Sequence, residues 1–245
     1  GLRLSRGLVL TVQGGSVSAG ATAVLVRQRA AFLMRYPAVA TNLILGEFLG
    51  DLAGSETLQL VDSHGRILDE LFYNADDDWP LVVPAGRSLV RRNPFAPPAG
   101  HDATPAWRVS RDEGGNPGAT DSVTFAAWLQ DHGLLNAAPD FDSDGDGDSN
   151  LAEFYAGSNP TDALSRATVS GRIVGPGTNA SFLVEFTRQT GADELSGCVL
   201  TSSDLHWWSE GEAVITNVQY LANGRELLRF VDRAPVGTAT NRFAT

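Results

Sequence analysis

One acidic stretch constrains this chain more than any other part of its sequence. Residues 142–153 read Asp-Ser-Asp-Gly-Asp-Gly-Asp-Ser-Asn-Leu-Ala-Glu, and the wider window from Asp112 to Ser165 holds eleven acidic residues and no Arg or Lys. That window accounts for the whole formal net charge of −11, because acidic and basic residues cancel in the rest of the chain. Carboxylates this close together repel one another, and a bound cation would relieve this repulsion.

The spacing of the carboxylates matches the needs of Ca²⁺, which takes about six to eight oxygen ligands. Asp142, Asp144 and Asp146 alternate along the sequence, so their side chains turn inward together as the loop curls. Gly147 at the sixth position permits the sharp bend, and Glu153 at the twelfth position closes the site with both carboxylate oxygens, as in EF-hand-like loops. The predicted ligands are Asp142, Asp144, Asp146, Asp148 through its carbonyl, Asn150 directly or through water, and Glu153.

A solvated, disordered acidic linker is the alternative interpretation, because clustered like charges often stay extended. A linker, however, requires neither the glycine at the sixth position nor the glutamate at the twelfth among apolar residues. Ser149 stands at the eighth position, where paired calcium sensors carry an apolar residue. We therefore expect a solitary structural Ca²⁺ and no sensor function.

Helical patterns flank the loop on both sides. Apolar residues three and four apart predict a short amphipathic helix within residues 122–133, and a second helix follows the loop and is closed by Gly157 and Pro160. The apolar positions are Phe125, Trp128 and Leu129 in the first helix and Leu151, Phe154 and Tyr155 in the second.

The segment from Asp142 to Asp162 resembles the thrombospondin type 3-like calcium repeats of large secreted bacterial proteins. Besides the acidic loop, its Gly-Ser-Asn-Pro-Thr-Asp ending at residues 157–162 matches that family. The resemblance implies bound calcium and an extracellular setting.

Strand patterns dominate the rest of the chain, so the predicted fold class is mostly β. We expect three parts: a β-sandwich over residues 1–121, a helix–calcium loop–helix linker over 122–165, and a second small β-sandwich over 166–245. Calcium would fix the geometry between the two β modules. The clearest strand patterns are Leu8–Val12, Thr22–Val26, Thr57–Val61, Arg66–Tyr73, Ser88–Arg92, Thr168–Val174, Ser181–Arg188, Cys198–Ser203, Ala213–Tyr220 and Glu226–Val231, with a short helix over Gln28–Tyr36.

The first part resembles the lamin tail domain, an immunoglobulin-like sandwich. The matching segments, in the family's order, are Gly1–Ser5 with Leu2 in place of an aromatic residue, Leu58–Tyr73, Trp79-Pro80, Ser88-Leu89, Trp107–Ser110 and Gly115–Gly118. The resemblance implies that the strands preceding Leu2 are missing from this chain. It also implies a connection to spore-coat CotH-type kinases or secreted hydrolases, which bacterial domains of this kind accompany.

Near the C-terminus, residues 203–208, Ser-Asp-Leu-His-Trp-Trp, resemble the corner of a small β domain that often follows such calcium repeats. The Arg242-Phe243 ending supports the same resemblance. If Trp207 and Trp208 lie on a strand, their side chains point to opposite faces. We expect one of them in the core and the other exposed.

Signals of catalysis are absent from the sequence. The four histidines are scattered, and there is no HExxH motif, phosphate-binding loop or G-x-S-x-G elbow. Cys198 is the only cysteine, which excludes an intrachain disulfide. No stretch approaches the ~18 apolar residues of a membrane-spanning helix, and the acidic window repels nucleic acid.

Together these features predict a non-catalytic, calcium-stabilised structural or interaction region of a secreted or cell-surface bacterial protein. Its protein or carbohydrate ligand stays unassigned, with no nucleic-acid binding and no membrane insertion. The main alternative is an accessory module, carbohydrate-binding for example, of a secreted enzyme. An exposed row of aromatic side chains would favour that alternative, whereas an enzyme proper would need a pocket with converging titratable groups.

Overall fold

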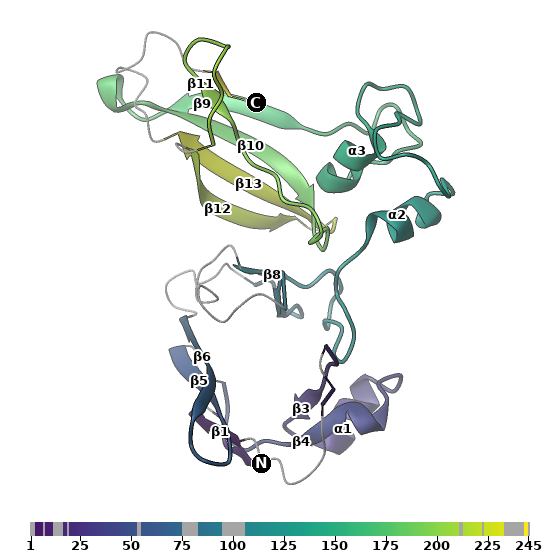
Figure 1. The fold of residues 1–245 in the computed structure, drawn as a ribbon, viewed down its shortest axis with the longest axis vertical. Helices are drawn as coiled ribbons and strands as arrows, with labels where there is room; N and C mark the ends of the chain where they lie inside the picture. The colour runs from purple at the N-terminus through teal and green to yellow at the C-terminus, as the bar shows by residue number, and fades with distance from the viewer. Residues whose placement is uncertain are drawn as a thin grey trace. The chain divides into compact units, whose positions relative to one another are not determined.

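The chain forms two compact units, Gly1–Asp121 and Ser122–Thr245. The computed structural model describes residues 3–6, 8–11, 17–18, 20–52, 55–74, 83–94, 106–210, 213–221, 223–232 and 243–244 (Figure 1). The structure is mostly β, as the sequence predicts, and strands hold many more of the described residues than helices do. Leu2, Trp79 and Arg242, which contribute to the family resemblances, lie outside the described residues.

An antiparallel sheet of the order β2-β1-β5-β6 lies in the first unit. Its strands are β1 (Arg3–Arg6), β2 (Leu10–Thr11), β5 (Ser55–Val61) and β6 (Ile67–Asn74). The turn between β5 and β6 has the geometry that its sequence predicts. Asp62 Oδ1 accepts hydrogen bonds from the backbone N–H of His64 at 2.8 Å and of Arg66 at 2.9 Å, and Gly65 takes a φ of +80°. These bonds, the one from Arg66 first, lower the pKa of Asp62.

Two further strand pairs belong to this unit. β3 (Val24–Val26) and β4 (Ile44–Glu47) are parallel, and α1 (Arg29–Arg35) and the 3₁₀ turn η1 (Thr41–Leu43) lie in the connection between them. β7 (Leu89–Arg91) pairs with β8 (Trp107–Val109). The buried residues of the β3–β4 core are Val24, Val26 and Ile44, covered by Phe32, Leu33 and Leu43.

The second unit is built on an antiparallel sheet of the order β12-β13-β10-β9 (Figure 1). Its strands are β9 (Val169–Val174), β10 (Ser181–Gln189), β12 (Ala213–Leu221) and β13 (Arg225–Asp232), with the turn η4 (Gly177–Asn179) between β9 and β10. Every second residue of β13 is buried, as expected of a strand with one face on a core. That core consists of Val184, Val199, Leu228 and Phe230.

A second pair, β11 (Thr201–Ser202) with β14 (Phe243–Ala244), follows in the same unit. Trp207 and Trp208 lie in the loop after β11 and not on a strand. The expectation that one of them is buried is wrong, because their side chains are 82% and 36% exposed.

Two short helices precede this sheet: α2 (Phe125–Asp131) and α3 (Asn150–Ala156). They share a small core of Val123, Trp128, Leu129, Phe154 and Ala192. α3 also contacts β10, and Thr187 of β10 donates a hydrogen bond to the Ala156 carbonyl at 3.3 Å. The segment 122–165 is therefore part of the second unit, packed on its sheet.

Candidate metal centre

The acidic loop connects α2 to α3, and backbone and amide contacts close its base. Asn150 N–H donates to the Phe141 carbonyl at 2.8 Å, and Leu151 N–H donates to the Pro139 carbonyl at 2.9 Å. The Asn150 side chain is fully buried, and its Nδ2 donates to the Ala138 carbonyl at 3.0 Å. Its Oδ1 is buried without a hydrogen-bond partner. The Asn150 side chain thus stabilises the base of the loop through its amide nitrogen. Its amide oxygen makes no hydrogen bond and could coordinate a cation.

Asp142 curls the first half of the loop. Its carboxylate accepts hydrogen bonds from the N–H of Gly145 at 2.7 Å, of Asp146 at 3.2 Å and of Gly147 at 2.8 Å. Such bonds favour the charged form of the acid. The bond from Gly147 contributes most to a lowered pKa of Asp142, against an opposing effect of burial.

Gly145 and Gly147 supply the backbone conformation that this curl needs. Their φ angles are +80° and +103°, in the region that residues with a side chain rarely adopt. No atom lies within 4 Å of where a Cβ would stand at either position. Glycine is therefore required here by the backbone angle and not by crowding.

The three alternating aspartates converge as the sequence predicts. One carboxylate oxygen each of Asp142, Asp144 and Asp146 lies within 4.8 Å of the other two. Oδ1 of Asp144 accepts from Asp146 N–H at 3.2 Å, and Oδ1 of Asp146 accepts from Asp148 N–H at 2.7 Å. The second oxygens of Asp144 and Asp146 are buried and have no hydrogen-bond partner. The loop thus gathers carboxylate oxygens at a spacing that a hard cation could bridge, and it leaves two buried oxygens without a hydrogen-bond partner.

Glu153 lies in the first turn of α3, and its side chain is fully buried. Its Oε1 accepts a hydrogen bond from the Ser158 hydroxyl at 3.2 Å, whereas its Oε2 is buried with no hydrogen-bond partner. Burial raises the pKa of Glu153 to about 7, the Ser158 bond opposes this, and the charges of three aspartates add to it. Those aspartates are Asp144, Asp146 and Asp148. A carboxylate in this position is costly unless a cation compensates it.

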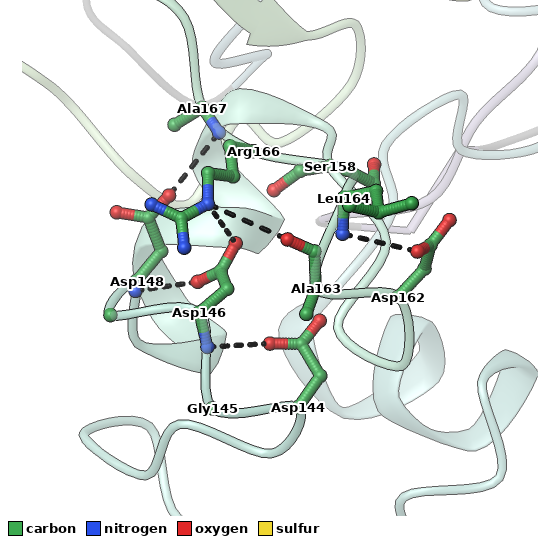
Figure 2. A network of polar contacts seen from close by, with 12 residues as sticks. Asp144, Gly145, Asp146, Asp148, Ser158, Asp162, Ala163, Leu164, Arg166 and Ala167 are labelled. Atoms are coloured by element: carbon green, nitrogen blue, oxygen red, sulfur yellow. Dashed lines mark hydrogen bonds and ion pairs between the residues drawn. The ribbon is translucent and has the colours of Figure 1, made fainter.

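Asp148 and Arg166 connect the loop to the segment that leads into β9 (Figure 2). Asp148 Oδ2 accepts from the N–H of Ala167 at 3.2 Å, so this side chain is used outside the aspartate cluster. Arg166 Nε lies 3.6 Å from Asp146 Oδ2 and donates to the Ala163 carbonyl at 3.5 Å. One guanidinium therefore partly neutralises the cluster.

Sequence reasoning missed Arg166 and Ser158 as members of this site. A signal for Arg166 was present, because it is the first basic residue after the acidic window that ends at Ser165. Ser158 carried no such signal, because its contact with Glu153 depends on the turn that follows α3. In that turn Gly157 is left-handed, with a φ of +76°, and Ser158 N–H donates to the Glu153 carbonyl at 3.1 Å.

No protein-family model matches the chain, and searches of curated proteins and of solved structures also gave no match. Among the described residues, no helix has the length and hydrophobicity needed to cross a membrane.

Proposed function

We propose that the loop Asp142–Glu153 binds one structural Ca²⁺ in a non-catalytic region of a secreted or cell-surface bacterial protein. The observation that carries the proposal is Glu153, whose fully buried carboxylate has one oxygen without a partner. Three aspartates lie close enough for their charges to raise its pKa. A buried acid beside other acids destabilises a fold unless a cation is bound among them.

The donor set favours calcium over other metals. Asp142, Asp144 and Asp146 offer carboxylate oxygens, Glu153 can offer two, and the remaining positions offer carbonyl and amide oxygens. Oxygen-only sites bind Ca²⁺ or Mg²⁺, whereas Zn²⁺ prefers the nitrogen and sulfur of His and Cys. Ca²⁺ accepts a backbone carbonyl and a bidentate glutamate, while Mg²⁺ demands a stricter octahedral shell.

Bound calcium would stabilise the whole second unit through α3. Glu153 stands in α3, whose Phe154 is fully buried in the core shared with α2. Fixing Glu153 also fixes the contacts of α3 with β10. An ion present at a hundredfold excess over its dissociation constant adds ~2.7 kcal/mol to the stability of the folded state.

The family resemblances are part of the same proposal. A thrombospondin type 3-like repeat would account for the loop and its Gly-Ser-Asn-Pro-Thr-Asp ending. An immunoglobulin-like sandwich of the lamin tail type would account for the antiparallel β5–β6 hairpin of the first unit. A second small sandwich would account for the sheet β12-β13-β10-β9. The resemblance to thrombospondin type 3-like repeats also implies an extracellular location, where calcium is plentiful.

Thermal unfolding with calcium and with a chelator tests the calcium site. We expect the wild type to melt about 5–10 °C higher in millimolar CaCl₂ than in EDTA. Asp144→Ala should remove most of this difference, whereas Asp140→Asn, which neutralises an exposed acid beside the loop, should preserve it. MgCl₂ at the same concentration should have a smaller effect. Identical melting of the wild type in CaCl₂ and in EDTA would show that the loop is no structural calcium site.

A further inference from the structure

The loop after β11 exposes apolar side chains that a folded protein normally covers. Trp207 is 82% exposed, Leu205 is 54% exposed and Trp208 is 36% exposed. Tryptophan is among the more buried residue types on average, so an almost fully exposed one often marks an interaction site. The calcium loop makes no use of these residues, and neither does any core of the described part of the chain.

Hydrogen bonds hold this loop in one conformation. Its neck is closed by Thr201 and Ser209, which exchange backbone hydrogen bonds of 2.9 and 3.0 Å. Inside the loop, Asp204 Oδ1 accepts from the N–H of His206 at 2.8 Å and of Trp207 at 2.9 Å. The backbone that carries the Trp207 side chain is therefore already ordered. Binding of a partner to Trp207 would lose little conformational entropy of this loop.

Leu205 adds backbone strain to the loop. Its φ is +64°, and Asn136 is the only other residue apart from glycine in the described part of the chain with a positive φ. The Ser202 hydroxyl stabilises this turn by accepting from Leu205 N–H at 2.9 Å. A branched side chain in the left-handed region costs ~1–2 kcal/mol. Leu205 is exposed and belongs to none of the described cores, so burial of its side chain does not offset this strain. The strained backbone instead fixes the shape of the exposed loop.

The charge of the surrounding segment excludes two classes of partner. The chain has no Arg or Lys between Arg188 and Arg225, and five acidic residues lie in that interval. Such a segment repels nucleic acid and anionic lipid surfaces. The three apolar side chains expose on the order of 400 Å², about half of the ~800 Å² per partner in a stable protein interface.

A neutral polysaccharide carries no charge that this acidic segment would repel. The C–H groups on one face of a sugar ring carry partial positive charge, which the π-face of an indole attracts. Polar groups for the sugar hydroxyls occur in the same loop: the exposed His206 ring donates from Nδ1 to the Asp204 carbonyl at 2.9 Å, so this bond uses one of its two ring nitrogens. Ser203 in the loop and Glu210 directly after it are also exposed. We propose that the loop Thr201–Ser209 is a binding platform for a neutral polysaccharide, with Trp207 stacked on a sugar ring.

Binding to insoluble polysaccharides tests this proposal with the full chain in calcium-containing buffer. The probes are microcrystalline cellulose, colloidal chitin and insoluble mannan, and the free protein is measured after sedimentation. We expect the wild type to bind at least one of them and Trp207→Ala to lose tenfold or more in affinity. Trp207→Tyr, which retains an aromatic face, should lose less. Leu135→Ala, which truncates a 68% exposed apolar residue elsewhere in the same unit, should bind as the wild type does.

The possible outcomes separate the platform from other roles. Wild type that binds none of the three polysaccharides overturns the proposal, as does Trp207→Ala protein that binds unchanged. Wild type that sediments with phosphatidylcholine vesicles and not with polysaccharide identifies a lipid surface as the partner, which also overturns it. Equal melting temperatures of wild type and Trp207→Ala show that lost binding is not lost folding. None of these outcomes depends on whether the acidic loop binds calcium.

Discussion

At the scale of single residues, Glu153 is at once a predicted cation ligand, which must be charged, and a buried side chain, for which a charge is unfavourable. It belongs to a predicted cation site, yet it is fully buried and its Oε2 has no hydrogen-bond partner. Without metal, the ionised side chain destabilises the fold, because burial raises its pKa to about 7. With metal, the same carboxylate could close the site as a bidentate ligand. The Glu153 carboxylate should therefore destabilise the folded state without the ion and stabilise it with the ion bound.

Glu153→Gln separates these two contributions. The neutral amide has nearly the same shape and cannot carry the buried charge, so at pH 8 in EDTA the variant should be more stable than the wild type by about 1–3 kcal/mol. In millimolar CaCl₂ it should gain little, because the closing ligand is weakened. Chemical unfolding in each buffer measures both effects. A variant less stable than the wild type in EDTA would show that the buried charge costs nothing.

Arg166 should lower the calcium affinity of the site. Its guanidinium lies 3.6 Å from the buried Oδ2 of Asp146 and is itself 60% exposed, so it competes with the cation only moderately. Arg166→Gln should increase calcium affinity about two- to tenfold and decrease stability in EDTA. Titration calorimetry measures the affinity. Arg172→Gln is the matched control, because Arg172 is 59% exposed and pairs with Glu185 on the sheet. Equal calcium affinity of the two variants would exclude competition by Arg166.

At the scale of elements, one carboxylate connects three strands of the second sheet. Glu185 of β10 accepts from Arg229 of β13 at 2.7 Å and from Arg172 of β9 at 3.4 Å. The bond from Arg229 comes first among the causes that lower the pKa of Glu185 below its ordinary value of 4.5. An acid with a depressed pKa stabilises the fold above its unfolded pKa, and this contribution is lost as the pH falls through the folded pKa.

The Glu185 carboxylate should therefore produce part of the acid sensitivity of the protein. Glu185→Gln should be less stable than the wild type near pH 7, and the difference should shrink as the pH falls below 4.5. Melting temperatures of the two proteins between pH 7 and pH 3 measure this, in EDTA to exclude proton competition at the calcium loop. A constant difference over that range would mean that the Glu185 charge contributes nothing.

Local elements of this chain were predictable from sequence, and distant pairings were not. α2, α3 and the turn at Gly147 follow from spacing within a few residues, so the pattern of residues 122–157 predicts them correctly. The parallel β3–β4 pair and the order β12-β13-β10-β9 depend on contacts between segments far apart. The exposed loop at Trp207 was missed because Asp204 and Ser202 hold a turn where alternating burial on a strand was expected.

At the scale of the whole molecule, the two compact units should respond differently to calcium. The predicted ligands all belong to the second unit, and α3, which carries Glu153, contacts β10. Removal of calcium should therefore increase hydrogen exchange in residues 141–158 and in β10. Exchange in the β5–β6 hairpin should stay unchanged. Mass spectrometry of peptides from the intact chain measures both. Equal loss of protection in β5–β6 would mean that the ion stabilises the chain as one cooperative body.

The shortness of α3 has a consequence for the lifetime of the protein if it is secreted, as we propose. Seven residues form too short a helix to persist alone, since about 12–15 are needed in water. Where calcium is scarce, α3 should fray first and turn the acidic loop into an accessible cleavage site for extracellular proteases. The concentration of one small ion would then set the lifetime of the protein. We expect such a chain to endure in calcium-rich surroundings and to be degraded when it leaves them.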